Sequence, residues 1–183
     1  MFEYEGECNF QTIVENNQKI REINLDVHLQ LVRRFCNIIA SEVILRAKKH
    51  DFSKISEEEF QTFKEYVPLL KGVTYGSPEY KVLLEQISPA TKHHYKENRH
   101  HPEHFENGIK EMHLVDVVEM LCDWFAATTK HADGDIYKSI EINQKRFGYS
   151  DELKHIFLNT VEFIKEKDIT DLPVNTDWNH SNQ

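Results

Sequence analysis

The longest run of helical periodicity in this chain ends at a His-Asp doublet, and this junction constrains the fold more than any other feature. From about Gln18 to Lys49, apolar side chains recur at steps of three and four residues, the spacing of one helix face. The doublet His50-Asp51 follows directly. The sequence therefore predicts a long amphipathic helix with an imidazole and a carboxylate at its end.

The rest of the chain is also patterned for helices that are separated by short breaks. We expect residues 1–18 to be an irregular lead-in, and Ser56 and Glu59 to form a capping box at the start of a helix. Residues 99–108 are expected to form a loop. Further helices are predicted over about 78–86, 88–98, 114–131, 136–146 and 150–166. The pattern predicts an all-α fold, with a single domain over 1–167 and a polar tail over 168–183.

Composition narrows the possible partners. The chain has 22 Lys and Arg against 31 Asp and Glu, so its formal net charge is −9, which argues against binding the nucleic-acid backbone. No apolar run approaches membrane-spanning length, and the N-terminus has no hydrophobic signal region. Three widely spaced cysteines predict neither a disulfide framework nor a Cys-x-x-Cys metal site. We expect a cytoplasmic protein with no nucleic-acid or membrane partner; the sequence leaves its oligomeric state open.

Histidines and an aspartate continue on both sides of the doublet. His28 lies upstream on the long predicted helix, and Asp116 lies on a later one. Between the doublet and Asp116 come His93, His94, His100, His101 and His104. Neutral imidazole and carboxylate groups are the natural ligands of divalent ions such as Zn, Fe, Mn and Ni. A lone histidine on an apolar face is usually a hydrogen-bonded core residue, so the prediction of a metal site depends on the order and spacing of the whole set.

This order resembles the HD superfamily of metal-dependent phosphohydrolases, and the resemblance covers about residues 28–123. It implies a compact HD-like bundle of about six or seven helices around a central metal site. It also implies a first ion bound by His28, His50, Asp51 and Asp116. Members with two ions have further histidine ligands before the last Asp. His94 and His101 match these best, with His93, His100 and His104 as competitors. The implied cofactor is one or two divalent ions of Mn, Fe, Zn, Ni, Co or Mg.

The same resemblance implies roles for charged residues near the doublet. Some HD phosphodiesterases read His-Asp-x-Gly-Lys, in which the Lys reaches the substrate phosphate, and this chain reads His-Asp-Phe-Ser-Lys. Lys54 is therefore predicted to bind the substrate phosphate. Arg99, the other basic residue nearest the cluster in sequence, is predicted either to bind the same phosphate or to be ordinary surface charge. Glu119 is either a general base or part of a solvated acidic stripe. Asp123 either orients a ligand histidine or pairs elsewhere.

One geometric condition applies to His28. On a straight helix its distance from His50 would be about 33 Å at the ordinary rise of 1.5 Å per residue, too far to share an ion. Either the helix bends near Ala40-Ser41, or the first ligand is not His28.

The resemblance implies a metal-dependent phosphohydrolase that acts on a nucleotide or another small phosphate ester. One alternative is an HD-type di-iron oxygenase, and another is a non-catalytic, metal-stabilised nucleotide-binding protein of phage or mobile-element origin. A histidine-rich loop that stores nickel or zinc is a third. The strings at 98–105 and 118–124 also resemble an uncharacterised family of bacterial and phage HD-like proteins.

Overall fold

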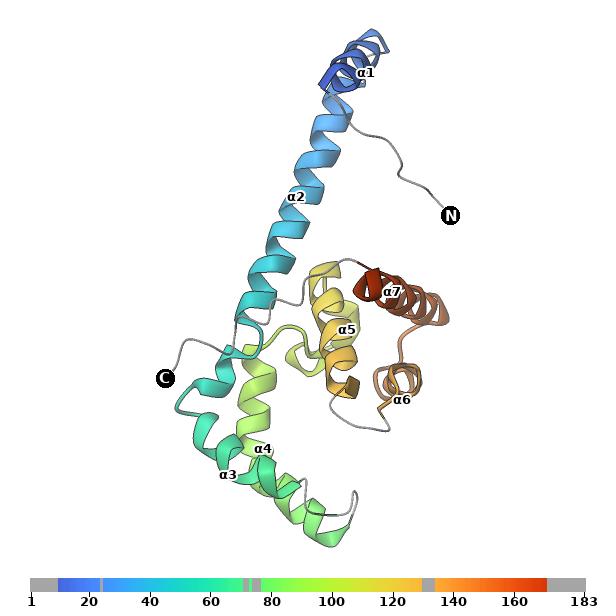
Figure 1. The fold of residues 1–183 in the computed structure, drawn as a ribbon. Helices are drawn as coiled ribbons and strands as arrows, with labels where there is room; N and C mark the ends of the chain where they lie inside the picture. Colours follow the sequence, from blue (N-terminus) through green and yellow to red (C-terminus); the bar gives the residue numbers. More distant parts are fainter. Residues whose placement is uncertain (1–9, 24, 71–72, 74–76, 130–133, 171–183) are drawn as a thin grey trace. The chain divides into compact units, whose positions relative to one another are not determined.

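The fold is all-α, as the sequence predicts. The computed structural model describes residues 10–23, 25–70, 73, 77–129 and 134–170. These residues form seven α-helices and three short 3-10 helices, with no strand among them (Figure 1). The helices are α1 (Phe10–Glu22), α2 (Asp26–Lys49), α3 (Phe60–Leu70), α4 (Pro78–Glu97), α5 (Leu114–Thr129), α6 (Ile136–Phe147) and α7 (Asp151–Thr170), and the 3-10 helices are η1 (Phe52–Ile55), η2 (Pro102–His104) and η3 (Gly108–Glu111).

The chain divides into two compact units, residues 1–48 and residues 49–183. The first unit contains α1 and nearly all of α2. Helix α1 begins at Phe10, so the expectation of an irregular lead-in is wrong for residues 10–18, while residues 1–9 lie outside the described part. The long helix predicted from Gln18 to Lys49 is two helices. The break falls between Glu22 and Asp26, and α2 then runs unbroken through Ala40-Ser41.

The core of the second unit is built by α5, α6 and α7. Met120 and Leu121 of α5 pack with Ile140 of α6 and with Phe157 and Val161 of α7, all of them buried. Full burial of side chains of this size contributes about 1.5–3 kcal/mol each, which makes this cluster the main apolar support of α5. The core therefore fixes α5, the helix that carries Glu119 and Asp123 of the candidate site.

The turn between α6 and α7 has the expected cap chemistry. Gly148 takes the left-handed conformation with φ of 67°, and its N–H donates to the carbonyl of Gln144 at 2.8 Å. A glycine at this position ends the helix without steric cost. Helix α7 continues to Thr170, into the region predicted to be tail, and residues 171–183 lie outside the described part.

Helices α3 and α4 lie side by side and bring a second group of residues into the same unit (Figure 1). Two helices were predicted over 78–98, with a start at Ser88-Pro89, but α4 is a single helix with Pro89 inside it. It begins where Ser77 accepts a hydrogen bond from the backbone N–H of Tyr80. Ile87, Ala90 and His94 are buried at steps of three and four, so one buried face continues through Pro89.

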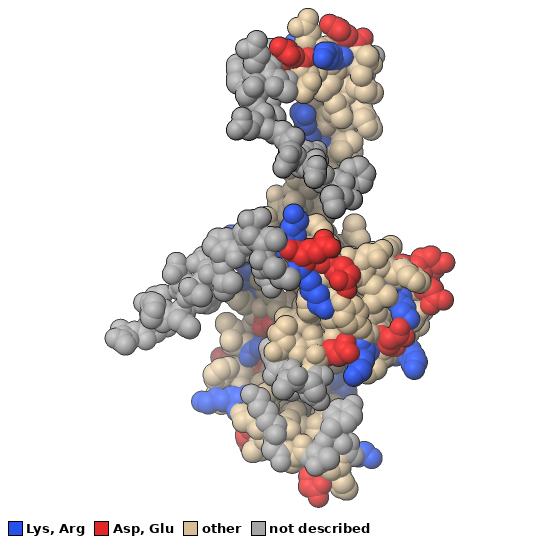
Figure 2. All heavy atoms as spheres, turned by 45° about the vertical axis from the view of Figure 1, so that its right-hand side comes forward, with Lys and Arg blue, Asp and Glu red and all other residues tan. Residues whose placement is uncertain are grey.

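Charged side chains of both signs are interspersed on the face of the molecule that Figure 2 presents. Within the described segments, no helix combines the length and the apolar character needed to cross a membrane.

Candidate metal centre

Four side chains from three separate segments converge in the second unit. Asp51 follows the end of α2, His94 is on α4, and His100 and His101 lie in the segment between α4 and η2. One ligand atom from each lies within 4.8 Å of every other. His94 Nε2 lies 3.1 Å from Asp51 Oδ1, and His100 Nε2 lies 3.5 Å from the same oxygen. The arrangement therefore offers three imidazole nitrogens and one carboxylate oxygen to a single point.

The backbone at Asp51 is in an uncommon conformation. Its φ is 59° and its ψ is 18°, in the left-handed helical region. Among the described residues it is the one non-glycine residue with positive φ. Such conformations cluster at functional sites, although aspartate tolerates this region better than most residues. The chain turns here from α2 into η1, and the backbone N–H of Lys54 donates to the Asp51 carbonyl at 2.9 Å.

Three of the converging atoms are buried without a hydrogen-bond partner. They are Asp51 Oδ1, His100 Nε2 and His101 Nε2. A buried polar atom left unpaired costs about 1–3 kcal/mol, so native structures rarely keep three together without a reason. A divalent cation bound by these atoms and His94 Nε2 would satisfy all of them. The donor set fits a metal on this ground.

A second group lies beside the first. One ligand atom each of His50, His100 and Asp123 also lie within 4.8 Å of one another. His50 Nε2 lies 3.4 Å from Asp51 Oδ2 and 3.5 Å from Asp123 Oδ1. Asp51 therefore directs one oxygen toward each group, and His100 belongs to both.

Glu119 contacts the His50 and His100 rings at the nitrogen that faces away from the two groups. Its Oε1 lies 2.9 Å from His50 Nδ1 and 3.1 Å from His100 Nδ1. When each Nδ1 carries the hydrogen, both rings direct Nε2 toward the two groups. Glu119 was predicted as a general base or as part of a solvated stripe; its contacts are those of a residue that orients imidazoles.

The pKa shifts follow from these contacts. Hydrogen bonds to Asp123 and Glu119 raise the pKa of His50 to about 10. Burial would favour the neutral form of Asp51, but the nearby imidazoles of His100 and His94 and the ammonium group of Lys54 outweigh it and lower the pKa of that carboxyl. Burial, then the neighbouring charges of His100 and His94, lower the pKa of His101 to about 3. His101 is therefore neutral at physiological pH, the state in which an imidazole binds metal.

Asp116 lies outside both groups. Its carboxylate is fully buried and accepts hydrogen bonds from Arg99 Nε at 3.2 Å and Nη2 at 3.0 Å. The backbone N–H of His113 donates to the same carboxylate at 3.0 Å. Arg99 also stacks on the ring of Phe105 at 4.8 Å. Asp116 was predicted as a metal ligand and Arg99 as a phosphate-binding residue. In the structure the two side chains form an ion pair with each other.

His28 is not among the residues of either group. It is exposed on α2 in the first unit. Helix α2 is unbroken, so His28 and Lys48, 20 residues apart on it, are separated by about 30 Å along the helix axis. The bend that would bring His28 toward His50 is absent from α2. Two of the competing histidines have other partners: His93 Nδ1 lies 2.8 Å from Glu59 Oε1, and His104 Nδ1 lies 3.2 Å from the Tyr95 carbonyl.

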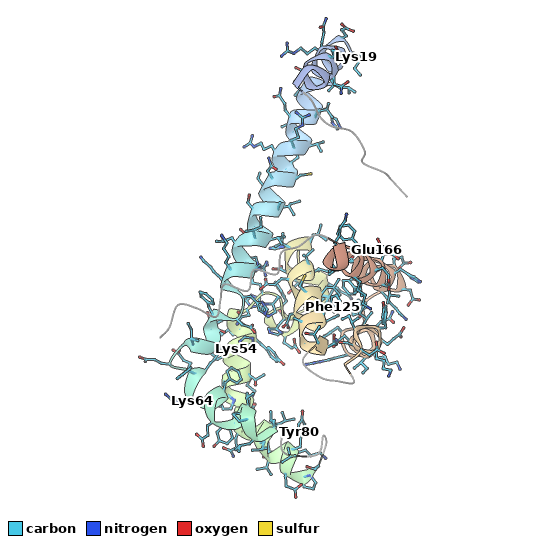
Figure 3. The ribbon with its side chains drawn as sticks, viewed as in Figure 1. Lys19, Lys54, Lys64, Tyr80, Phe125 and Glu166 are labelled. Carbon is cyan, nitrogen blue, oxygen red and sulfur yellow. The ribbon has the colours of Figure 1, made fainter. Side chains whose placement is uncertain are left out.

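The structure thus brings together four of the predicted ligands, His50, Asp51, His94 and His101. It adds His100, which the sequence offered as an alternative ligand to His101. It also adds Asp123, which was predicted to orient a ligand histidine or to pair elsewhere. Lys54 lies beside the site on η1, with its Nζ 2.5 Å from Asp51 Oδ2 and 45% of its side chain exposed (Figure 3). Glu59 was missed as a site residue because local sequence predicts only a helix cap for it.

Residues 17–167 match a family of unknown function (DUF5662), and the chain belongs to this family. No curated protein matches the chain, and no solved structure matches it.

Proposed function

We propose that the protein is a metal-dependent phosphohydrolase of the HD type that acts on a nucleotide or another small phosphate ester. The observation that carries the proposal is the convergence of Asp51 Oδ1, His100 Nε2 and His101 Nε2, buried without partners, on one point beside His94 Nε2. The order of these residues along the chain, including the His-Asp doublet, supports the HD assignment.

Asp51, His94, His100 and His101 would hold the first ion. His50 and Asp123 would contribute to a second ion, whose binding would displace a proton from His50. Three imidazoles and one carboxylate suit Zn, Fe, Mn, Co or Ni better than Mg, which prefers oxygen ligands. A bound ion of this kind supplies Lewis-acid stabilisation of phosphate oxygens and lowers the pKa of a coordinated water.

The chain's own side chains have separate tasks. Lys54 is partly exposed and adjacent to Asp51, so its ammonium group can offset charge on a phosphate that reaches the site from solvent. Glu119 keeps His50 and His100 oriented through their Nδ1 atoms. Arg99 is held by Asp116 and stabilises the segment that carries His100 and His101, so Lys54 is the predicted phosphate-binding residue that remains available.

The test is hydrolysis by protein loaded with Mn, Co, Ni, Zn or Mg. Nucleoside monophosphates, cyclic nucleotides and a generic phosphodiester would be assayed with wild type, with Asp51→Ala and with Asp26→Ala as a matched control. Asp26 carries the same carboxylate but belongs to neither group. We expect turnover of at least one substrate, lost by orders of magnitude in Asp51→Ala and retained in Asp26→Ala.

Other outcomes would redirect the proposal. Oxygen consumption with bound iron, without hydrolysis, would favour the di-iron oxygenase. Tight nucleotide binding with neither reaction would favour a non-catalytic nucleotide-binding protein.

A further inference from the structure

A glutamate outside the metal centre is more deeply buried than any carboxylate in it. Glu59 has no exposed surface, although it lies between η1 and α3 on a connecting segment. Its Oε1 lies 2.8 Å from His93 Nδ1 and its Oε2 lies 2.9 Å from His94 Nδ1. Burying a carboxylate is costly unless it is well paired, so this position calls for a reason beyond local structure.

Helix capping does not supply that reason. Helix α3 begins at Phe60, and the Glu59 carbonyl accepts the backbone N–H of Phe63 at 3.0 Å. The Glu59 side chain does not fold back on the start of its own helix, as the predicted capping box requires. It reaches α4 instead, 34 and 35 residues further along the chain. The capping-box prediction is therefore wrong for Glu59.

We propose that Glu59 is a positioning residue that holds two adjacent histidines by their Nδ1 atoms, so that His94 presents Nε2 to the metal centre. A carboxylate oxygen accepts and an imidazole N–H donates, so the contact requires the hydrogen on Nδ1. The lone pair of neutral His94 is then on Nε2, the atom 3.1 Å from Asp51 Oδ1. The inference deepens the proposed function, since it rests on the same metal centre.

Two other polar groups, from Ser53 and Asn98, lie near His94 Nδ1. Ser53 Oγ lies 2.9 Å from Nδ1, and Asn98 Nδ2 donates to that hydroxyl at 2.7 Å. Asn98 Nδ2 also donates to the His94 carbonyl at 2.8 Å. Asn98 Nδ2 also lies 3.1 Å from His94 Nδ1. The Ser53 hydroxyl can donate or accept, whereas the Glu59 carboxylate can only accept and is the stronger acceptor, so the assignment of the hydrogen to Nδ1 rests on Glu59. The serine in the His-Asp-Phe-Ser-Lys string thus joins the support of the ligand.

His93 completes the pairing. Consecutive residues on a helix point about 100° apart, yet both rings reach the same carboxylate, one to each oxygen. Without His93, Glu59 Oε1 would lose this donor in a fully buried position. His93 therefore supports Glu59 without being a ligand itself, which accounts for the two adjacent histidines.

The tautomer can be read directly. Two-bond ¹H–¹⁵N spectra of the full-length, metal-free protein at about pH 8, above the ordinary imidazole pKa, report which ring nitrogen carries the hydrogen. The His94 signal would be assigned by its loss in His94→Ala. We expect the Nδ1–H tautomer; an Nε2–H tautomer at His94 would overturn the inference.

Metal affinity gives the second measurement. Competition between Zn²⁺ or Co²⁺ and a chelator should show about 10- to 100-fold weaker binding by Glu59→Leu, the range typical of lost outer-shell partners. Glu59→Gln should lie between, because its amide oxygen can accept from only one of the two rings. Glu57→Gln is the matched control, since Glu57 is exposed two residues earlier, and its affinity should match wild type.

These readouts separate positioning from simple stabilisation and from the proposed reaction. A folded Glu59→Leu protein that binds metal as tightly as wild type contradicts the positioning role. If Glu59→Leu does not fold, Glu59→Gln and the wild-type tautomer decide. A protein with the expected tautomer and affinities but no hydrolysis refutes the phosphohydrolase and leaves Glu59's role intact, whereas hydrolysis with an Nε2–H tautomer does the reverse.

Discussion

Replacing Arg99 with alanine should destabilise the second unit while leaving the metal centre occupied, because Arg99 holds the buried carboxylate of Asp116. The pair makes two hydrogen bonds, from Nε at 3.2 Å and Nη2 at 3.0 Å. Asp116 has no exposed surface, whereas 44% of the Arg99 side chain is exposed. The pair is therefore intermediate between a surface salt bridge and a fully buried one.

This partial exposure determines how much the Arg99–Asp116 pair contributes to the free energy of unfolding. Exposed pairs contribute about 0.2–1 kcal/mol, and breaking a buried pair costs about 3–5 kcal/mol. We expect a coupling of about 2 kcal/mol between Arg99 and Asp116, because water screens one partner only. Arg99→Ala should cost more than Asp116→Asn, since the first leaves a buried charge without its guanidinium and the second leaves a guanidinium that water can reach.

The assay is a double-mutant cycle. Wild type, Arg99→Ala, Asp116→Asn and the double variant would be unfolded in urea, and the fluorescence of Trp124 would be followed together with circular dichroism. Trp124 packs against the aromatic core of the second unit, so it reports the unfolding of that unit. A chelator in every sample removes the contribution of bound metal to stability. Metal affinity would be measured separately on the folded proteins.

A different pattern would refute the reasoning. If Asp116→Asn loses its metal while its free energy of unfolding in chelator matches wild type, Asp116 is a ligand, as the HD resemblance implies. A coupling energy near zero would show that the ion pair does not stabilise the unit. Retained metal with a coupling of about 2 kcal/mol confirms that Asp116 is structural.

Three further predictions concern the centre and the core. Asp51→Ala should lose its metal. By calorimetry it should melt at a lower temperature than wild type in metal-containing buffer, but at the same temperature in chelator; stoichiometric metal in the variant would contradict this. Lys54→Ala should lower kcat by about 100-fold in the phosphatase assay, with the exposed Lys64→Ala as control; an unchanged kcat would remove Lys54 from the reaction. Phe157→Ala should lower the free energy of unfolding by about 3–5 kcal/mol, and Phe163→Ala on the exposed side of α7 by less than about 0.5 kcal/mol; equal losses would contradict the assigned core.

The bounds of helices with clear capping residues at both ends were predicted best. Helix α6 was expected over 136–146 and runs from Ile136 to Phe147, with Asp135 accepting two backbone N–H groups at its start and Gly148 at its end. Cap chemistry and apolar periodicity are both local, so sequence reports them directly. Helix α4 shows the limit of that reasoning. Ser88-Pro89 has the composition of a helix start, yet the buried face of α4 continues through it, and tertiary packing outweighs the local signal.

The last aspartate of the metal pattern could not be chosen from sequence. Asp116 and Asp123 are seven residues apart on α5, almost two full turns, so they share one stripe of the helix within about 20°. Periodicity cannot distinguish them. Their positions along the axis differ by about 10.5 Å, and only the packing of α5 against the rest of the unit determines which one meets His50. In the structure it is Asp123, whose Oδ1 lies 3.5 Å from His50 Nε2.

Glu59 shows why the outer part of the site is harder to predict than its centre. Ligands are recognised because few residue types bind metal and their order is constrained. A residue that orients a ligand needs only an acceptor at the right place, and any of the chain's 31 acidic residues qualifies by type. Glu59 meets His94 Nδ1 across 35 residues of sequence, and Glu119 meets His50 Nδ1 across 69. Burial distinguishes Glu59 from its exposed neighbours Glu57 and Glu58, and burial is a property of the fold. An acidic chain has carboxylates enough for both places: Asp51 and Asp123 face the candidate centre, and Glu59 and Glu119 contact the imidazole rings from the other side.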